Sequence, residues 1–258
     1  MVIDGRALAR EIIEYLKTKP RPRKRLAAIL AGSNASSVSF LKKKKEVADQ
    51  LGVSFAVHQF NKNARSVKLL ELFKDVAGDE TVGGIILQLP LPKQFQRESF
   101  LKILPKEKDV DNLTGAARVL PPVVATTQTV LKKVRADTEN KTVAVVGKGF
   151  LVGQPIIKWL QGKCKEVAVF NEKSGLNGIE RADIVISGVG KAKLFNAAVL
   201  KSGAGVIDFG YSFGKDNKLY GDFDPQDTRR ISWYTPTPGG TGPILVAELF
   251  RNFYMLNQ

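Results

Sequence analysis

Stretches with helical spacing of apolar residues alternate with short apolar runs along nearly the whole chain, and this alternation most constrains the fold. The apolar runs predict strands at 25–32, 53–60, 82–92, 141–149, 165–171, 182–190 and 203–210. The stretches between them predict helices at 5–19, 37–52, 66–78, 126–136, 151–162 and 244–256. Strands that alternate with helices form parallel sheets, so the sequence predicts an α/β protein.

The alternation restarts once, after an irregular stretch at 109–126. A chain of 258 residues can form one large domain or two small ones. We therefore predict two domains with a boundary near residue 118. The first occupies 1–118 and the second 119–242, and a Pro- and Gly-rich loop at 235–243 leads into the last helix at 243–258.

A glycine-rich turn joins the first strand of the second domain to the following helix. The strand pattern ends at Gly147, and Gly149 and Gly153 follow, which gives GxGxxxG, one residue longer than the usual dinucleotide fingerprint. Glycines permit a tight turn, and the helix N-terminus presents free N–H groups to a pyrophosphate. Asn171 and Glu172 end the next strand about 25 residues after Gly147, where a ribose-binding acid is expected. The turn predicts a Rossmann-like dinucleotide site, although such turns also occur for packing reasons alone.

The chain is strongly basic, with 40 Lys and Arg residues against 25 Asp and Glu residues and a net charge of +15. This balance favours an anionic partner, such as nucleic acid, a phosphorylated cofactor or a polyanionic substrate. The basic residues are scattered and form no known nucleic-acid motif, so we do not expect nucleic acid to be the partner.

The sequence offers few metal ligands and no membrane span. A single cysteine, Cys164, excludes an internal disulfide and a cysteine-cluster metal site, and a single histidine, His58, excludes a multi-histidine site. We expect no metal, an inert Cys164 and a structural His58. The longest apolar runs fall far short of the ~20 residues that span a bilayer. The first residues indicate an amphipathic helix rather than a signal peptide, so a cytoplasmic protein is expected.

Several motifs, in order, resemble one enzyme family, the bifunctional methylenetetrahydrofolate dehydrogenase/methenyltetrahydrofolate cyclohydrolases. The segment GSNASSVSFLKKKKEVADQLGV resembles the family helix G-x-x-x-x-S-x-x-Y-x-x-x-K, GGIILQLPLP its QLPLP strand, and PKEKDVDNL its P-x-K-D-V-D-G segment. The segment VVGKGFLVGQP resembles its glycine loop, and ADIVISGVGKA, GVIDFG, YGDFD and TPTPGGTGP resemble the remaining blocks. The ordered set covers nearly the full chain.

The resemblance implies a folate-binding α/β domain and a Rossmann-like domain, with the active site in the cleft between them and the last helix packed back on the first domain. It implies oxidation of 5,10-methylenetetrahydrofolate by NAD or NADP and hydrolysis of the methenyl product to 10-formyltetrahydrofolate. These are steps of the one-carbon metabolism that serves purine biosynthesis. A homodimer is implied as well. The positive surface is expected to attract a polyglutamylated folate tail, which charge reversal of surface lysines would test.

The resemblance assigns a folate site in the first domain. Counting back from Gly52 places the catalytic lysine at Lys44 and the family tyrosine at Phe40, four residues earlier on the same helix face. Lys42, Lys43 and Lys45 are then expected to form a solvated face. The catalytic residues implied are Lys44, Gln88 and Asp111, where Gln88 holds the lysine and Asp111 binds the pterin. The substrate-binding residues implied are Phe40, Ser37, Leu89, Pro90, Pro238, Gly239 and Gly240.

The resemblance also assigns the cofactor site. It includes Gly147, Lys148, Gly149, Val152, Gly153, Pro155, Asn171, Glu172, Lys173, Ser187, Val189, Gly190, Asp208, Gly210, Thr241 and Gly242. Glu172 favours a ribose 2′-hydroxyl and repels a 2′-phosphate, whereas Lys148 and Lys173 could pair with that phosphate. The Arg-Ser pair of the family loop is Lys148-Gly149 here, so the sequence leans slightly towards NAD.

Other departures keep alternatives open. Phe40 lacks the tyrosine hydroxyl, Asn112 replaces the glycine after Asp111, the family's P-C-T-P-x-G is VATTQT, and its His-Ser after the second Rossmann strand is Asn171-Glu172. A dehydrogenase with impaired cyclohydrolase activity is therefore one alternative. A non-catalytic, basic nucleic-acid-binding relative is another. The QLPLP and DVD blocks disfavour a third, a shikimate dehydrogenase.

Overall fold

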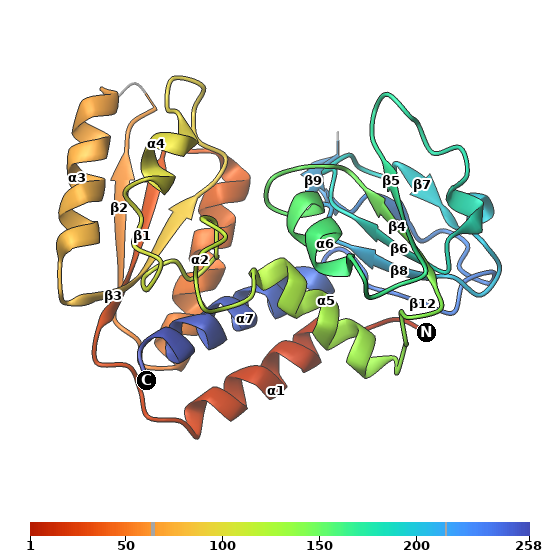
Figure 1. Ribbon diagram of the computed structural model, residues 1–258, viewed down its shortest axis with the longest axis horizontal. Coiled ribbons are helices and arrows are strands. Elements are labelled where there is room, and N and C mark those ends of the chain that lie inside the picture. Colours follow the sequence, from red (N-terminus) through yellow and green to blue (C-terminus); the bar gives the residue numbers. More distant parts are fainter. Residues whose placement is uncertain (63–64, 215) are drawn as a thin grey trace. The chain divides into compact units, whose positions relative to one another are not determined.

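The structure is a computed structural model that describes residues 1–62, 65–214 and 216–258. The chain divides into two compact units, each built on a parallel sheet. One unit contains Arg10–Pro122 and Val246–Gln258, and the other contains Met1–Ala9 and Val123–Leu245. Figure 1 shows the elements of both. We call them the N-terminal unit and the Rossmann unit.

The N-terminal unit is built on a three-stranded sheet in the order β2-β1-β3, with β1 at Arg25–Ala31, β2 at Phe55–Phe60 and β3 at Val82–Gln88. All but the first residue of β1 are buried, as expected for a central parallel strand covered on both faces. Ala27, Ile29, Ile85 and Leu87 belong to one core with Phe73 of α3 (Ser66–Gly78). Helix α2 (Ala35–Gln50) connects β1 to β2, and the short helix α4 (Arg97–Leu101) follows β3.

The last helix, α7 (Thr241–Leu256), brings its second half into the N-terminal unit. The Asn252 amide donates to the carbonyl oxygens of Val110 and Leu120, both at 2.8 Å. Gly84 of β3 has no room for a side chain, because a Cβ there would lie 2.7 Å from the Phe253 ring. Residues 84 and 85 alternate across the sheet. Helix α7 therefore packs on the face opposite to the α3 core.

The Rossmann unit is built on a five-stranded parallel sheet in the order β12-β8-β6-β4-β5. Its strands are β4 (Thr142–Val146), β5 (Glu166–Phe170), β6 (Ile184–Ser187), β8 (Gly205–Asp208) and β12 (Trp233–Tyr234). Helix α5 (Pro122–Lys133) precedes β4, and α6 (Gly153–Leu160) joins β4 to β5. Short elements complete it: η1 (Ile179–Arg181), η2 (Ala197–Val199), the pair β7 (Phe195–Asn196) and β11 (Phe223–Asp224), and the pair β9 (Ser212–Phe213) and β10 (Leu219–Tyr220).

The first residues of the chain extend this sheet, a feature that the domain prediction did not include. Val2 forms a parallel bridge to Tyr234, and the backbone of Tyr234 bonds to both Met1 and Ile3. Residues 1–9 thus group with the Rossmann unit, although α1 (Gly5–Lys17) continues into the other. The observed division after Pro122 lies close to the predicted boundary near 118.

The predicted α/β class is confirmed, and the predicted strands agree with β1 to β6 and β8 to within a few residues. The two-residue strand β12 was missed, because two residues carry no readable periodicity. Helix α5 begins at Pro122, earlier than predicted, with proline at its first position, where no backbone N–H is needed. Across the residues described, no helix combines the length and apolar character that a membrane span requires.

Candidate functional site

Helix α2 separates one lysine of the run 42–45 from the other three. Lys44 is buried, with 5% of its surface exposed, whereas Lys42, Lys43 and Lys45 are exposed. Lys43 pairs with Glu46 at 3.3 Å, and Lys45 pairs with Asp49. The predicted solvated face is confirmed, and Lys44 alone of the four is turned inward.

The buried ammonium group bonds to the end of β3. Lys44 Nζ donates to Gln88 Oε1 at 3.0 Å, and Gln88 Nε2 donates to the Leu89 carbonyl oxygen at 3.0 Å. Because the amide is bonded on both sides, its oxygen is held towards the lysine. Gln88 is the last residue of β3 and pairs in register with Leu30 of β1. The carboxyl end of the sheet therefore fixes the position of the amide that holds Lys44.

A carboxyl group complements this lysine electrostatically. Burial lowers the pKa of Lys44, and the negative charge of Asp111 acts in the opposite direction. Burial likewise raises the pKa of Asp111; the positive charge of Lys44 opposes this shift, and the negative charge of Asp109 reinforces it. Both shifts favour the neutral forms. A lowered amine pKa and a raised carboxyl pKa both make these groups better suited to proton transfer than ordinary surface groups.

The segment around Asp111 is fastened by its neighbours. The Asp109 carboxylate is fully buried and accepts backbone N–H bonds from Leu113 at 2.9 Å and Thr114 at 2.8 Å. Asn112 has a positive φ of 48° and donates to the Val119 carbonyl oxygen at 2.7 Å. Asparagine tolerates this left-handed conformation better than most residues. The replacement of the family glycine therefore preserves the turn.

The other residues predicted to bind substrate in this unit lie at the start of α2 and the end of β3. Ser37 is buried, and its hydroxyl donates to the Leu89 carbonyl oxygen at 3.4 Å. Its backbone N–H is capped by the Asn34 side chain at 3.2 Å. The Leu89–Pro90 peptide is cis, and Phe40 is partly buried. Ser37, Gln88 and Leu89 are thus directly linked to the group around Lys44.

The glycine loop shows which glycines the backbone requires. Gly147 has a φ of +97°, and a Cβ at Gly153 would lie 2.0 Å from the Gly147 carbonyl oxygen. At Gly149 a Cβ would meet no heavy atom of the described residues within 4 Å. Gly147 and Gly153 therefore shape the turn, and Gly149 leaves an open backbone surface.

The first turn of α6 directly follows the glycine loop, and we call the two together the cradle. Within the residues that the structure describes, the N-cap Val152 makes no side-chain cap bond. The Gln154 N–H donates to the Gly149 carbonyl oxygen at 3.0 Å and Pro155 has no N–H, so this turn offers a phosphate the positive end of the helix dipole rather than a full set of free N–H groups. Lys148 is exposed, and Pro155 lies within the first turn. These residues fit a dinucleotide's pyrophosphate.

The end of β5 lies beside this turn. The Gly147 N–H donates to the Phe170 carbonyl oxygen at 2.8 Å, so Asn171 follows at the same carboxyl edge of the sheet. The Asn171 side chain accepts the N–H bond of Lys173 at 2.8 Å and forms a tight turn. Glu172 and Lys173 are both exposed there. The structure thus brings the three predicted ribose-side residues, Asn171, Glu172 and Lys173, next to the glycine loop.

A buried carboxylate organises the loop after β6. Asp222 accepts the Ser187 hydroxyl at 2.6 Å and the backbone N–H groups of Val189 at 2.7 Å and Lys191 at 2.8 Å. Ser187, predicted to bind cofactor, is fully buried and uses its hydroxyl in this bond. Gly190, with a φ of +74°, lies in the loop that Asp222 holds. Asp222 shapes the backbone of this predicted cofactor segment.

A second buried acid organises the end of β8. Asp208 accepts N–H bonds from Gly210 at 2.7 Å and Phe223 at 2.9 Å. Burial raises the pKa of Asp208 to about 7, while its backbone hydrogen bonds oppose the shift. The Thr241 hydroxyl donates to the Asp208 carbonyl oxygen at 2.7 Å. Asp208, Gly210 and Thr241 are therefore joined, with the carboxyl group of Asp208 directed at the protein's own backbone.

The loop before α7 is closely packed at its glycines. Gly239 has a φ of +98°, and a Cβ at Gly5 would lie 1.8 Å from the Gly240 carbonyl oxygen. The Thr237–Pro238 peptide is cis, and Pro238 is exposed. Gly242 lies in the first turn of α7. These predicted substrate and cofactor residues belong to the Rossmann unit.

Cysteine and metal chemistry find little support in the described residues. The Cys164 thiol is partly buried, and burial raises its pKa, which disfavours the reactive thiolate. His58 lies on β2, at the edge of its sheet. Over the described ranges, no three His, Cys, Asp or Glu side chains gather in a way that could hold a metal ion.

Comparison with known families identifies both halves of the chain. Residues 3–111 match the catalytic domain of tetrahydrofolate dehydrogenase/cyclohydrolase, and residues 121–258 match the NAD(P)-binding domain of the same enzyme. The chain belongs to the tetrahydrofolate dehydrogenase/cyclohydrolase family. The family resemblance expected from the sequence is thereby confirmed.

Individual relatives match over nearly their full lengths. The bifunctional protein FolD of Helicobacter pylori (strain HPAG1) is 30% identical over 271 residues, which cover 98% of this chain and 93% of that protein. The structure is similar to that of the bifunctional FolD enzyme from Campylobacter jejuni, with a TM-score of 0.90, 29% identity and coverage of 100% and 98% of the two chains. It is also similar to the Trypanosoma brucei enzyme complexed with NADP and an inhibitor, with a TM-score of 0.92, 26% identity and coverage of 99% and 96%.

The predicted site residues divide between the two family domains. Lys44, Gln88 and Asp111 lie in the part that matches the catalytic domain of the tetrahydrofolate dehydrogenase/cyclohydrolase family. The glycine loop and α6 lie in the part that matches its NAD(P)-binding domain. Sequence reasoning missed the buried carboxylates Asp109 and Asp222, whose only signal was their place in the DVD and YGDFD blocks.

Proposed function

We propose that this member of the tetrahydrofolate dehydrogenase/cyclohydrolase family carries out both reactions of its name and uses Lys44 as the proton-transfer group of the second. The reactions are oxidation of 5,10-methylenetetrahydrofolate to the 5,10-methenyl cation and hydrolysis of that cation to 10-formyltetrahydrofolate. The observation that carries this proposal is the buried Lys44 ammonium, bonded at 3.0 Å to Gln88.

In the oxidation, the protein contributes mainly position. The nicotinamide, when bound, supplies the hydride acceptor. The glycine loop and the first turn of α6 would hold the pyrophosphate, and the loops fastened by Asp208 and Asp222 would shape the remaining surface. Asp111, partly exposed at the end of its fastened segment, would accept the N–H donors of the pterin ring.

In the hydrolysis, water adds to the methenyl carbon and loses a proton, and the ring C–N bond then breaks while its nitrogen gains a proton. A lysine with a lowered pKa can take up and release that proton. Gln88 would keep the Nζ atom in place by its hydrogen bond. Phe40 keeps an aromatic face for stacking on the folate ring but lacks a phenolic hydroxyl.

The proposal is tested by two separate initial-rate assays on the purified chain. Reduction of NAD⁺ or NADP⁺ with 5,10-methylenetetrahydrofolate measures the oxidation, and loss of 5,10-methenyltetrahydrofolate without nicotinamide measures the hydrolysis. We expect both rates to exceed the uncatalysed ones. Oxidation without hydrolysis would support the dehydrogenase-only alternative, for which the missing hydroxyl of Phe40 is the specific reason.

We propose that Glu172 sets the cofactor preference and turns it towards NAD. Its exposed carboxylate follows β5 at the edge where the ribose is expected, and a carboxylate accepts a 2′-hydroxyl but repels a 2′-phosphate. Lys148 and Lys173 would act in the opposite direction, because their ammonium groups could pair with a 2′-phosphate. Replacing Glu172 by serine should raise kcat/KM for NADP⁺ relative to NAD⁺ by about 5- to 150-fold, the effect of 1–3 kcal/mol.

Initial rates over a range of each cofactor measure this ratio. Glu180→Ser is the matched control, because Glu180 is also exposed but lies in η1. An unchanged ratio in Glu172→Ser would show that Glu172 is not the determinant.

We also propose that the chain forms a homodimer, on the strength of the family resemblance. Sedimentation equilibrium of the purified protein tests this directly. A mass that stays at the 28.3 kDa of one chain would overturn it.

A further inference from the structure

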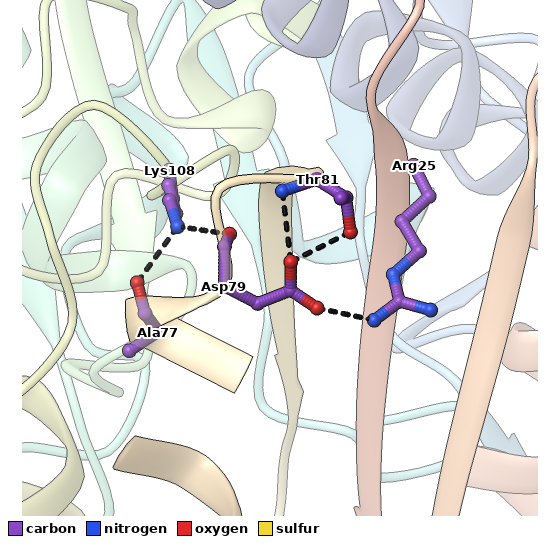
Figure 2. Close-up of polar contacts among 5 residues, drawn as sticks. All are labelled: Arg25, Ala77, Asp79, Thr81 and Lys108. Carbon is purple, nitrogen blue, oxygen red and sulfur yellow. Dashed lines mark hydrogen bonds and ion pairs between the residues drawn. The ribbon is translucent and has the colours of Figure 1, made fainter. Parts of the chain in front are cut away.

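Lys108, which lies three residues before Asp111, caps the C-terminal end of α3. Lys108 Nζ donates to the carbonyl oxygens of Ala77 and Asp79, both at 2.7 Å. Figure 2 shows the ammonium group between these two oxygens, with the Asp79 side chain turned away towards Thr81 and Arg25. The last carbonyl groups of a helix lack intrahelical partners and carry partial negative charge, so a cation is favoured there.

The main chain of the same residue is tied to β3. The Lys108 carbonyl oxygen accepts the Ile85 N–H at 2.7 Å, and Ile85 forms a parallel bridge with Asp109. The buried Asp109 carboxylate then fastens the turn that follows. Lys108 is thus bound at both ends, by its side chain to α3 and by its backbone to the central sheet.

We propose that Lys108 is a positioning residue for Asp111, through which the C-terminal end of α3 sets the orientation of the carboxylate that binds the pterin ring. This inference rests on the proposed role of Asp111. Asp111 comes three residues after Lys108 and two after Asp109, so the segment has little freedom once both are fastened. A carboxylate that must meet paired N–H donors binds well only when its orientation is set in advance.

The surroundings of Lys108 support a structural bond rather than a surface contact. Lys108 is partly buried, and its burial and the nearby positive charge of Lys24 lower its pKa. The negative charges of Asp79, Glu107 and Glu80 act in the opposite direction. Its ammonium group donates to two main-chain oxygens, those of Ala77 and Asp79.

The same cluster supplies a matched control. Arg25 pairs with the Asp79 carboxylate at 2.5 Å and so joins β1 to the end of α3 through the Asp79 side chain, whereas Lys108 bonds to the Asp79 main-chain oxygen. The Thr81 N–H also donates to the Asp79 carboxylate at 2.8 Å and would still hold it without Arg25. Arg25→Met should therefore weaken the cluster and leave Asp111 in place.

The experiment compares Lys108→Met, Lys108→Arg, Arg25→Met and Asp111→Asn with the wild type in both half-reactions. We expect Lys108→Met to lower kcat/KM for the folate substrate by roughly 10-fold or more. A higher folate KM should account for most of this loss, with the Kd of the nicotinamide cofactor unchanged. Arginine also offers two N–H donors, so Lys108→Arg should recover most of the loss. Thermal unfolding of each variant confirms folding.

The outcomes separate the inference from the role of Asp111. A raised folate KM in Lys108→Met and Asp111→Asn, but not in Arg25→Met, supports the positioning role. If Asp111→Asn raises the KM and Lys108→Met does not, the inference is overturned while the folate site stands. An equal rise of the folate KM in Arg25→Met and Lys108→Met would show that Lys108 only stabilises the fold, and the inference would be overturned. No change in Asp111→Asn would overturn the proposed role of Asp111 and the inference with it.

Discussion

Lys44→Met is expected to lose the hydrolysis of 5,10-methenyltetrahydrofolate by about 10²- to 10⁴-fold, the usual contribution of a positioned proton-transfer group. Methionine keeps the unbranched length of the side chain without the amine, so the loss reports chemistry rather than packing. The rate of methenyl loss without nicotinamide measures the effect. In the coupled reaction, the variant should accumulate the methenyl intermediate.

Two further variants show whether the loss is specific to the amine of Lys44. Lys44→Arg keeps the positive charge but cannot deprotonate near neutral pH, so it should remain as inactive as Lys44→Met. Lys43→Met removes an exposed lysine from the same run and should keep full activity. Because burial lowers the pKa of Lys44, the pH limb due to its deprotonation should lie below the ordinary lysine value of about 10.4. Full hydrolysis by Lys44→Met would show that another group transfers the proton.

Gly153→Ala should give the second large effect, a loss of nicotinamide cofactor binding with the hydrolysis retained. A Cβ at this position would lie 2.0 Å from the Gly147 carbonyl oxygen, so the turn and the start of α6 must move apart. Overpacking of this kind costs about 1–3 kcal/mol. If that cost falls on the cradle, the cofactor Kd rises about 5- to 150-fold. Fluorescence titration with NADPH and NADH measures it.

Gly149→Ala is the matched control for the packing effect in this prediction. It adds the same methyl group to the same loop, where no heavy atom of the described residues lies within 4 Å. Its thermal unfolding should therefore match the wild type, whereas Gly153→Ala should unfold earlier. Unchanged cofactor affinity in Gly153→Ala would show that this turn does not form the dinucleotide site.

The run of lysines at 42–45 shows how far the sequence could lead. Helical spacing and the family motif together selected Lys44, and its burial agrees with that choice. Periodicity alone could not select it, because four adjacent lysines cover more than one face of a helix. Its bond to Gln88 joins residues 44 positions apart and could come only from the motif or the fold.

The burial and the bonding partners of two carboxylates could not be predicted from the sequence. Asp109 and Asp111 lie two residues apart in the same motif. The Asp109 carboxylate accepts two backbone N–H bonds, whereas Asp111 is partly exposed. Asp222 joins β6 to a loop about 35 residues away, and such a bond leaves no local pattern. The bridge of Val2 to Tyr234 was missed for the same reason. Local patterns predict elements, whereas contacts distant in sequence decide what each polar side chain faces.

The most direct test of bifunctionality is a single progress curve. The purified chain is mixed with 5,10-methylenetetrahydrofolate and NAD⁺ or NADP⁺, and reduced nicotinamide and the methenyl chromophore are recorded together. The account predicts that reduced nicotinamide rises without lasting accumulation of the methenyl compound, because the same chain hydrolyses it. A methenyl signal that rises in step with the nicotinamide and is not cleared would contradict a cyclohydrolase centred on Lys44.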